Sequence, residues 1–145
     1  MARAAKELKK LQDNPEEGIT ISIQDDNFLK WIVKMEGPSG SPYEGGILTF
    51  KVDFPVEYPH EQPVISFYPI VFHPNVNQDD GIICLDMLRE WSPSFQIRKL
   101  FEEIKSVLVI PAVGHFDDGQ ICNLYENDRE EYIRQAKDWT AKYAH

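Results

Sequence analysis

Residues 72–88 read FHPNVNQDDGIICLDML and hold most of the side chains in this sequence that could do chemistry together. They include Cys84, one of two cysteines in the chain, with a His-Pro-Asn triplet upstream and several acids nearby. A thiol with these neighbours could ligate a metal, form a disulfide, attack a peptide bond or carry an acyl group. The rest of the chain has to favour one of these four roles.

Metal binding and disulfide formation are both disfavoured for Cys84. A structural zinc site needs about four ligands, often in closely spaced pairs, and the chain has no Cys-x-x-Cys or His-x-x-x-His pair. The first residues carry charges every few positions, unlike a signal peptide, and no apolar run reaches the ~20 residues that span a bilayer. We therefore expect a cytoplasmic or nuclear protein with reduced thiols, no bound metal and no membrane contact.

The second cysteine, Cys122, is predicted to be a core residue. It lies beside Ile121 and Leu124 in what the spacing predicts to be a short amphipathic helix. No motif that could do chemistry surrounds it, so Cys84 remains the reactive candidate.

A cysteine protease would need an imidazole in hydrogen-bond reach of Cys84 as its base. His73 could in principle fold back to serve, but Pro74 restricts the turn that holds it. A histidine in a rigid Phe-His-Pro-Asn turn is more typical of a structural hydrogen-bonding group. His73 and Pro74 are therefore predicted to be structural, and catalysis by His73 is the alternative.

Acidic residues outnumber basic ones 24 to 15, which leaves a net charge of −9. Such a molecule repels a phosphate backbone, so nucleic acid is not expected as a partner. Arg3, Lys6 and Lys10 nevertheless fall on one side of a predicted helix whose other side is apolar. A solvated face of a packed helix is the simpler interpretation, and a docking surface is the alternative.

The 145 residues are enough for one domain with a buried core, and no linker, repeat or low-complexity tract divides them. Alternating or continuous apolar residues between turn-forming segments predict strands at residues 18–23, 28–36, 47–54 and 63–67. Four consecutive strands joined by short turns indicate an antiparallel meander.

Helices are predicted before and after these strands, which makes the fold class α+β. The first helix ends at Asn14, because a proline follows. Apolar residues spaced i, i+3, i+4 and i+7 predict a helix over residues 95–109, and Asp128 with Glu131 forms a capping box for the last helix. The aromatic side chains of that last helix are predicted to pack in the core: Tyr132, Trp139 and Tyr143. Residues 68–95 show no period, and long irregular segments in compact domains are often functional.

Six motifs follow one another in an order that is typical of one family. They are GPSGSPYEGG (37–46), FPVEYP (54–59), FHPNV (72–76), GIICLDML (81–88), WSPSFQI (91–97) and DREEYIRQAKDWTAKYA (128–144). With these motifs the chain resembles the ubiquitin-conjugating enzymes over nearly all of its length. The resemblance implies a single conjugating core domain over residues 1–145, with an N-terminal helix, a four-stranded antiparallel sheet, a long active-site segment and C-terminal helices.

By this resemblance, Cys84 matches the cysteine that carries ubiquitin or a ubiquitin-like modifier as a thioester and passes it to a lysine amine. The reaction needs no cofactor here, since ATP is used by the upstream activating enzyme. Asn75 would donate a hydrogen bond to the oxyanion or brace the neighbouring loop. Asp86 and the other acids near the thiol disfavour its ionised form, which suits a carrier that must survive until an acceptor arrives.

The resemblance also implies partners, namely the modifier, the activating enzyme and a ubiquitin ligase, and we expect a monomer. Arg3 and Lys6 would bind the activating enzyme. Ligases would contact the first helix, the YPHEQP loop with His60, and the loop of Trp91, Ser92 and Pro93.

Three departures from the family pattern concern the choice of ligase and the transfer step. His60 stands where many members have phenylalanine, and Gln62 breaks the usual double proline. Counting back from DREEY without gaps places His115 where an acid that conditions the acceptor lysine commonly sits. The active-site loop is also one residue longer before Cys84. An active conjugating enzyme is the expected function, and a non-catalytic ubiquitin-binding adaptor of the same fold is the alternative.

Overall fold

The structure is a computed structural model that describes residues 2–112 and 119–145. Four strands form one antiparallel sheet in the order β1-β2-β3-β4, as predicted. Their bounds are Ile19–Gln24, Asn27–Glu36, Ile47–Asp53 and Val64–Phe67. Each lies within one residue of its predicted ends. The β1–β2 turn places Asp25 and Asp26 at positive φ (53° and 57°), as a type I′ hairpin turn requires.

Five helices are formed by the described residues, α1 (Arg3–Asp13), α2 (Asp86–Arg89), α3 (Ile97–Val109), α4 (Gly119–Asn127) and α5 (Arg129–Tyr143). Helix α1 ends before Pro15, as predicted. The side chain of Asp128 accepts a hydrogen bond from the Glu131 N–H, which confirms Asp128 as the N-cap of α5. The other half of the predicted capping box is not formed, because the Asp128 N–H donates to Leu124 and the Glu131 carboxylate binds Arg134. Helix α2, a single turn, was not predicted, because four residues are too few to show a period. No described helix combines the length and apolar character needed to cross a bilayer.

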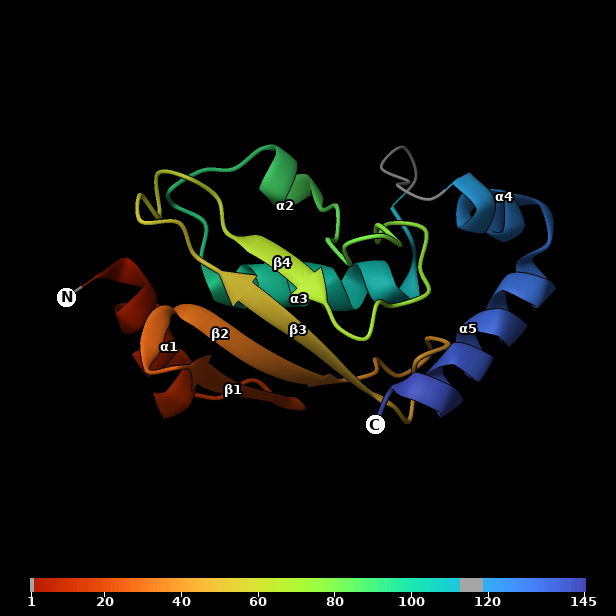
Figure 1. Cartoon of the computed structure of the whole chain (residues 1–145), viewed down its shortest axis with the longest axis horizontal. Coiled ribbons are helices and arrows are strands. Elements are labelled where there is room, and N and C mark those ends of the chain that lie inside the picture. The colour runs from red at the N-terminus through yellow and green to blue at the C-terminus, as the bar shows by residue number, and fades with distance from the viewer. Residues whose placement is uncertain (1, 113–118) are drawn as a thin grey trace.

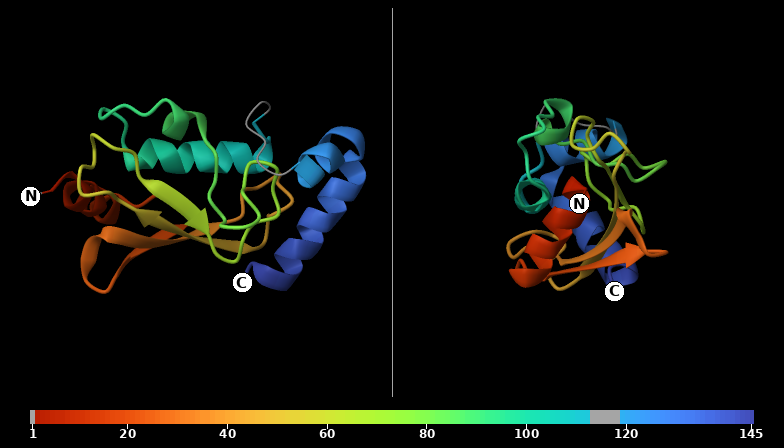
Figure 2. Two further views of the ribbon diagram at one scale, coloured as in Figure 1. Left: turned by 45° about the horizontal axis from the view of Figure 1, so that its top comes forward. Right: turned by 90° about the vertical axis from the view of Figure 1, so that its left-hand side faces the viewer.

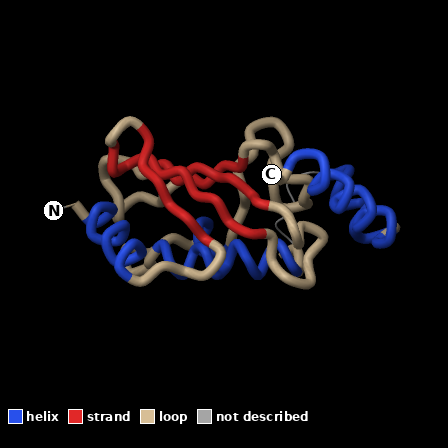
Figure 3. The backbone as a smooth tube through the Cα atoms, turned by 90° about the horizontal axis from the view of Figure 1, so that it is seen from below, coloured by secondary structure: helices blue, strands red, loops and turns tan. Residues whose placement is uncertain are grey.

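The core lies between the sheet and α3. Inward-facing residues of the strands, including Trp31, Phe50 and Ile65, are completely buried, and so are Leu100 and Phe101 of α3. The Phe50 and Phe101 rings meet edge to face with centroids 5.8 Å apart. Figure 3 shows the strands on one side of the molecule with α1 and α3 on the other. The apolar face that alternation gives to the strands and the apolar face that the helical period gives to α3 therefore pack against each other in one core.

Helices α4 and α5 lie at the opposite end of the molecule from α1 (Figures 1 and 2). Helix α5 holds the loop of residues 37–46, since Thr140 donates a hydrogen bond to the Pro42 carbonyl at 3.2 Å. Tyr43 of that loop is buried against Trp139. Of the aromatic residues predicted to pack, Tyr132 is buried and Trp139 is half-buried, but Tyr143 is 53% exposed and that prediction is wrong. The buried face of α5 is formed by Ala136 and Thr140 and continues to Ala144, and Tyr143 is rotated away from it.

Candidate active site

Cys84 lies in the irregular segment that connects β4 to α2. Its backbone N–H donates to the Asn75 carbonyl at 2.8 Å, and the preceding Ile83 N–H donates to Ile65 of β4 at 3.1 Å. Ile83 also forms an isolated bridge with Val76. The His-Pro-Asn triplet and the sheet thus hold the backbone at Cys84 from two sides, and the cysteine itself is partly exposed and makes no disulfide.

The conformation of the loop before Cys84 depends on one glycine and on hydrogen bonds among its polar residues. Gly81 has φ +77°, and a Cβ there would meet the Phe67 carbonyl oxygen at 2.3 Å, so only glycine fits without a shift. The side chain of Asn77 accepts hydrogen bonds from the N–H groups of Asp79 and Asp80. Asp80 in turn accepts from Ile82 at 2.9 Å. These hydrogen bonds therefore stabilise the turn that precedes Cys84.

His73 is completely buried, and both ring nitrogens bond to the backbone. Nδ1 accepts a hydrogen bond from the Asn75 N–H at 3.0 Å, so Nε2 carries the proton and donates to the Val107 carbonyl at 2.8 Å. Burial lowers the pKa of His73 to about 4, although the bond to Val107 opposes that shift. Such a neutral, doubly bonded ring ties the triplet to α3, and these contacts support a structural role. Pro74 beside it is buried as well.

We expect acid to weaken the folded protein through His73. Because its pKa in the folded state is about 4, against an ordinary value near 6.5, the stability it contributes is complete above pH 6.5 and is lost as pH falls toward 4. Between pH 7 and pH 5 the free energy of unfolding should fall by about 2 kcal/mol. Urea unfolding at both pH values measures this change.

A variant lacking the other three histidines isolates this effect. The chain has four histidines, so changing His60, His115 and His145 to glutamine leaves His73 as the only histidine that titrates between pH 7 and pH 5. That variant should retain the loss of stability. A free energy of unfolding that stays constant over this range would contradict the buried, neutral state of His73.

Asn75 is also completely buried, and its side chain binds the segment after α3. Its Nδ2 donates to the Ala112 carbonyl at 3.0 Å, and its Oδ1 accepts from the Ala112 N–H at 2.9 Å. The two bonds clamp the backbone of Ala112 against the loop of Cys84. This geometry favours the bracing role of Asn75 over direct contact with a reacting atom. His115, the other residue singled out near this segment, lies outside the described residues.

Asp86 begins helix α2, two residues after Cys84, and is exposed. The backbone N–H groups of Asp86 and Met87 donate to the carboxylate of Glu103 on α3, at 3.0 and 3.3 Å. Sequence reasoning missed Glu103, because an acid in the middle of an amphipathic helix is normally a solvated residue. No sequence pattern indicates that it reaches another helix.

The two loops predicted to bind ligases lie against each other. The indole Nε1 of Trp91 donates to the Pro59 carbonyl at 2.8 Å, next to the exposed His60. Pro93 is exposed and Ser92 is half-buried, and the Ser92 hydroxyl bonds to that of Ser94 at 2.9 Å. The structure thus brings these loop residues to one end of the molecule with α1, on the side where the N-terminus lies (Figure 1).

Arg3 holds one of these loops in place. Its guanidinium donates to the carbonyls of Pro93 and Phe95 and pairs with Glu7 at 3.3 Å. Lys6, by contrast, is exposed. The predicted basic face of α1 therefore divides into an arginine that braces the Trp91 loop and two exposed lysines, Lys6 and Lys10.

Glu7 is a buried acid that the sequence pattern did not reveal. Its carboxylate accepts hydrogen bonds from the Tyr58 hydroxyl and from the Ile97 N–H, the latter at 2.9 Å at the start of α3. Burial, followed by the bond to Glu7, raises the pKa of Tyr58 well above its ordinary value. Glu7 thereby joins α1 to α3 and to the loop of residues 54–63.

The prediction that Cys122 is a core residue is wrong. Cys122 is only half-buried, and its Sγ lies 3.6 Å from the Glu126 carboxylate on the same helix. Of the described residues of α4, Ile121 alone is buried, and a residue one position further along a helix is rotated by about 100°. Cys122 therefore falls at the edge of the buried face.

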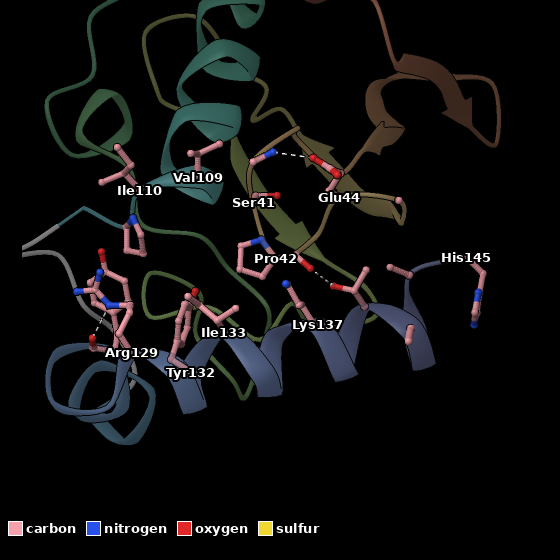
Figure 4. A pocket seen from close by; sticks show the side chains of 17 residues that line it. Ser41, Pro42, Glu44, Val109, Ile110, Arg129, Tyr132, Ile133, Lys137 and His145 are labelled. Atoms are coloured by element: carbon pink, nitrogen blue, oxygen red, sulfur yellow. Dashed lines mark hydrogen bonds between the residues drawn. The ribbon is translucent and has the colours of Figure 1, made fainter.

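Two cavities show what surface lies beside Cys84 and beside helix α5. One, of about 1010 Å³, runs between residues 40–45 and α5 and is lined by Tyr132, Lys137 and other residues that do not include Cys84 (Figure 4). The other, of about 320 Å³, is lined by Cys84 together with Val64 and Ile82. The second cavity places apolar surface beside the thiol. Among the described residues, no group of three or more His, Cys, Asp or Glu side chains could hold a metal ion.

Comparison with known proteins gives one consistent result. A family model described as ubiquitin-conjugating enzyme matches residues 3–140. The chain is 33% identical to "Ubiquitin conjugating enzyme E2 B" of Dictyostelium discoideum over 142 residues, which is 98% of this chain and 96% of that protein. It is 35% identical over 145 residues to "Ubiquitin-conjugating enzyme E2 1" of Schizosaccharomyces pombe, covering 98% of this chain and 66% of that one.

The solved structures agree with these relatives. The E2 domain of a Toxoplasma gondii ubiquitin conjugating enzyme superposes with a TM-score of 0.88 at 32% identity, covering 99% of this chain and 98% of that one. The family match and the superposition thus cover nearly the whole chain.

Proposed function

Because the chain belongs to the ubiquitin-conjugating enzyme family, a family of transferases that form thioesters, we propose that Cys84 accepts ubiquitin or a ubiquitin-like modifier from an activating enzyme and passes it to a lysine. One observation carries this proposal. Cys84 is a partly exposed thiol on a backbone that is held by the His-Pro-Asn triplet on one side and, through Ile83, by strand β4 on the other.

Charging exchanges one thioester for another. The Cys84 sulfur loses its proton and attacks the carbonyl carbon of the modifier's C-terminal glycine on the activating enzyme. A new carbon–sulfur bond forms as the old one breaks, and the departing thiolate of the activating enzyme takes up a proton. The bond energy is conserved in this exchange, so the step needs no cofactor on this chain.

Transfer moves the acyl group from sulfur to nitrogen. The lysine amine attacks the thioester carbon, a carbon–nitrogen bond forms, and Cys84 leaves as a thiolate that takes up the proton released by the amine. Since the chain offers Cys84 no imidazole base in His73, the rate depends on orientation of the reacting groups. The clamp between Asn75 and Ala112 supplies part of that orientation.

A charging assay tests the proposal. The protein is incubated with ATP, an activating enzyme and a panel of modifiers, and the products are separated on gels with and without a reducing thiol. An adduct that disappears with the thiol is expected. Failure to form an adduct with any modifier, together with measurable binding of free ubiquitin, would instead indicate the non-catalytic adaptor.

Ligases and the activating enzyme are proposed to bind the end of the molecule formed by α1 and the loops of Trp91 and His60. The exposed Lys6 and the exposed Pro93 belong to that surface. Arg3 contributes to it chiefly by holding the Trp91 loop.

Lys6→Glu is expected to slow charging roughly tenfold at low ionic strength, because reversing an exposed charge acts mainly on the rate of encounter. The difference should vanish at about 1 M salt, where charges are screened beyond about 3 Å. Initial rates of thioester formation at both salt concentrations measure it.

Lys9→Glu is the matched control for this surface. Lys9 lies on the same helix and carries the same charge, but it pairs with Asp13 at 3.4 Å and lines a cavity beside the β1–β2 turn. Charging by this variant should match the wild type. Because Lys9 lies three residues after Lys6, on the same side of α1, equal loss in both variants would mean that the positive charge of that side, and not Lys6 in particular, governs the encounter.

A further inference from the structure

Glu103 joins two helices next to the reactive thiol. It is a half-buried residue of α3, and its two carboxylate oxygens accept the N–H groups of Asp86 and Met87. These are the first two residues of α2, which begins two residues after Cys84. Figures 1 and 2 show α2 beside α3.

The start of α2 needs such a partner. The first N–H groups of a helix have no acceptor within the helix, and Leu85 at the cap position offers no side-chain hydrogen bond. A carboxylate there accepts stronger, charge-assisted bonds and is favoured by the partial positive charge of the helix end. The cap of α2 is thus supplied by a residue that is distant in the sequence, and it ties α2 to the core.

The same helix also holds the segment before Cys84. Val107 lies one turn after Glu103, and its contact to that segment is made by its backbone carbonyl. The Val107 carbonyl accepts the hydrogen bond of His73, while Glu103 accepts those of Asp86 and Met87. Helix α3 therefore makes hydrogen bonds to the segment before Cys84 and to the segment after it.

From this arrangement we infer that Glu103 is a positioning residue for acyl transfer from Cys84. By fixing the backbone of Asp86 and Met87, it fixes the direction from which an amine can reach the thioester carbon. The inference rests on the proposed function, and it concerns the transfer step of the same site. A misplacement of about 1 Å in such a site can lower the rate about 100-fold.

Two substitutions remove the contact to different degrees. In Glu103→Gln the amide oxygen can still accept one N–H, while the amide nitrogen can accept none. In Glu103→Ala both acceptors are lost. Preformed thioesters are mixed with free lysine over a range of concentrations, and single-turnover rate constants are measured. We expect the maximal rate constant to fall about 10-fold in the first variant and about 100-fold in the second, with the half-saturating lysine concentration unchanged.

Glu102→Gln is the matched control. It makes the same chemical change one residue away, where Glu102 is exposed and pairs with Lys99 at 3.2 Å. Its discharge rate should equal that of the wild type. NMR gives a second measurement, which a general loss of stability would not change. The chemical shifts of the Asp86 and Met87 amide protons should move upfield in Glu103→Gln and should be unchanged in Glu102→Gln.

The outcomes separate the two proposals. If the wild type charges but Glu103→Gln and Glu103→Ala discharge at the wild-type rate, or if Glu102→Gln is slowed as much, the positioning role is overturned and the proposed function stands. If the wild type takes up no modifier on Cys84, the proposed function fails and the role of Glu103 fails with it.

Discussion

Replacing Cys84 with serine is expected to abolish the thiol-sensitive adduct completely. The hydroxyl is a weaker nucleophile than the thiol, and any product that forms is an oxygen ester that survives reducing agent. Cys84→Ala should form no adduct of either kind. Gels of charging reactions with and without reducing thiol distinguish the three proteins, and the loss should exceed that of any other single substitution.

Cys122→Ser serves as the control for this prediction. Both cysteines are partly exposed, so exposure alone does not tell them apart. What differs is the surroundings, since Cys122 lies on α4 beside the carboxylate of Glu126 and Cys84 lies on the backbone fixed by Asn75. Charging should be unchanged in Cys122→Ser. Loss of charging there, with normal charging in Cys84→Ser, would show that the wrong thiol has been assigned.

Asn75→Ala is expected to leave charging nearly intact and to slow transfer to lysine about 100-fold or more. Without the side-chain amide, the backbone at Ala112 is released from the loop of Cys84, and small misplacements at a reacting centre have effects of this size. Loss of a direct oxyanion donor would slow transfer by about 100- to 1,000-fold, so the rate alone does not separate the two roles. Single-turnover discharge of a preformed thioester measures the rate.

Stability separates the bracing role of Asn75 from a direct one. Removal of the clamp leaves the partly buried N–H and carbonyl of Ala112 without these partners, which costs about 1 to 3 kcal/mol. Loss of a group that acts only on the reacting oxygen would leave the free energy of unfolding unchanged. Slow transfer with unchanged urea unfolding would therefore contradict the bracing role. Unchanged transfer would remove Asn75 from the site altogether.

The sequence by itself determined the four strands, the longer helices and the candidate for the reactive residue. Alternating residues such as Trp31, Val33 and Met35 mark a strand with one buried face, and the spacing of Leu100, Phe101 and Ile104 marks a helix, because each pattern has the period of its own backbone. The cap formed by Asp128 was readable because its partner lies only three residues away. Cys84 was singled out as a candidate by its motif, which is also local.

Only the tertiary structure decided which charged residues leave the solvent and what they bind. Glu7, Arg3 and Glu103 all lie on helices where the period of the sequence predicts solvated side chains. Each instead binds backbone groups of another segment, as Glu103 does at Asp86 and Arg3 at Pro93. The partners are 17 residues apart in the first case and 90 in the second. Local periodicity carries no information about such pairs, because an acid or a cation leaves water only where folding brings it unpaired donors or acceptors.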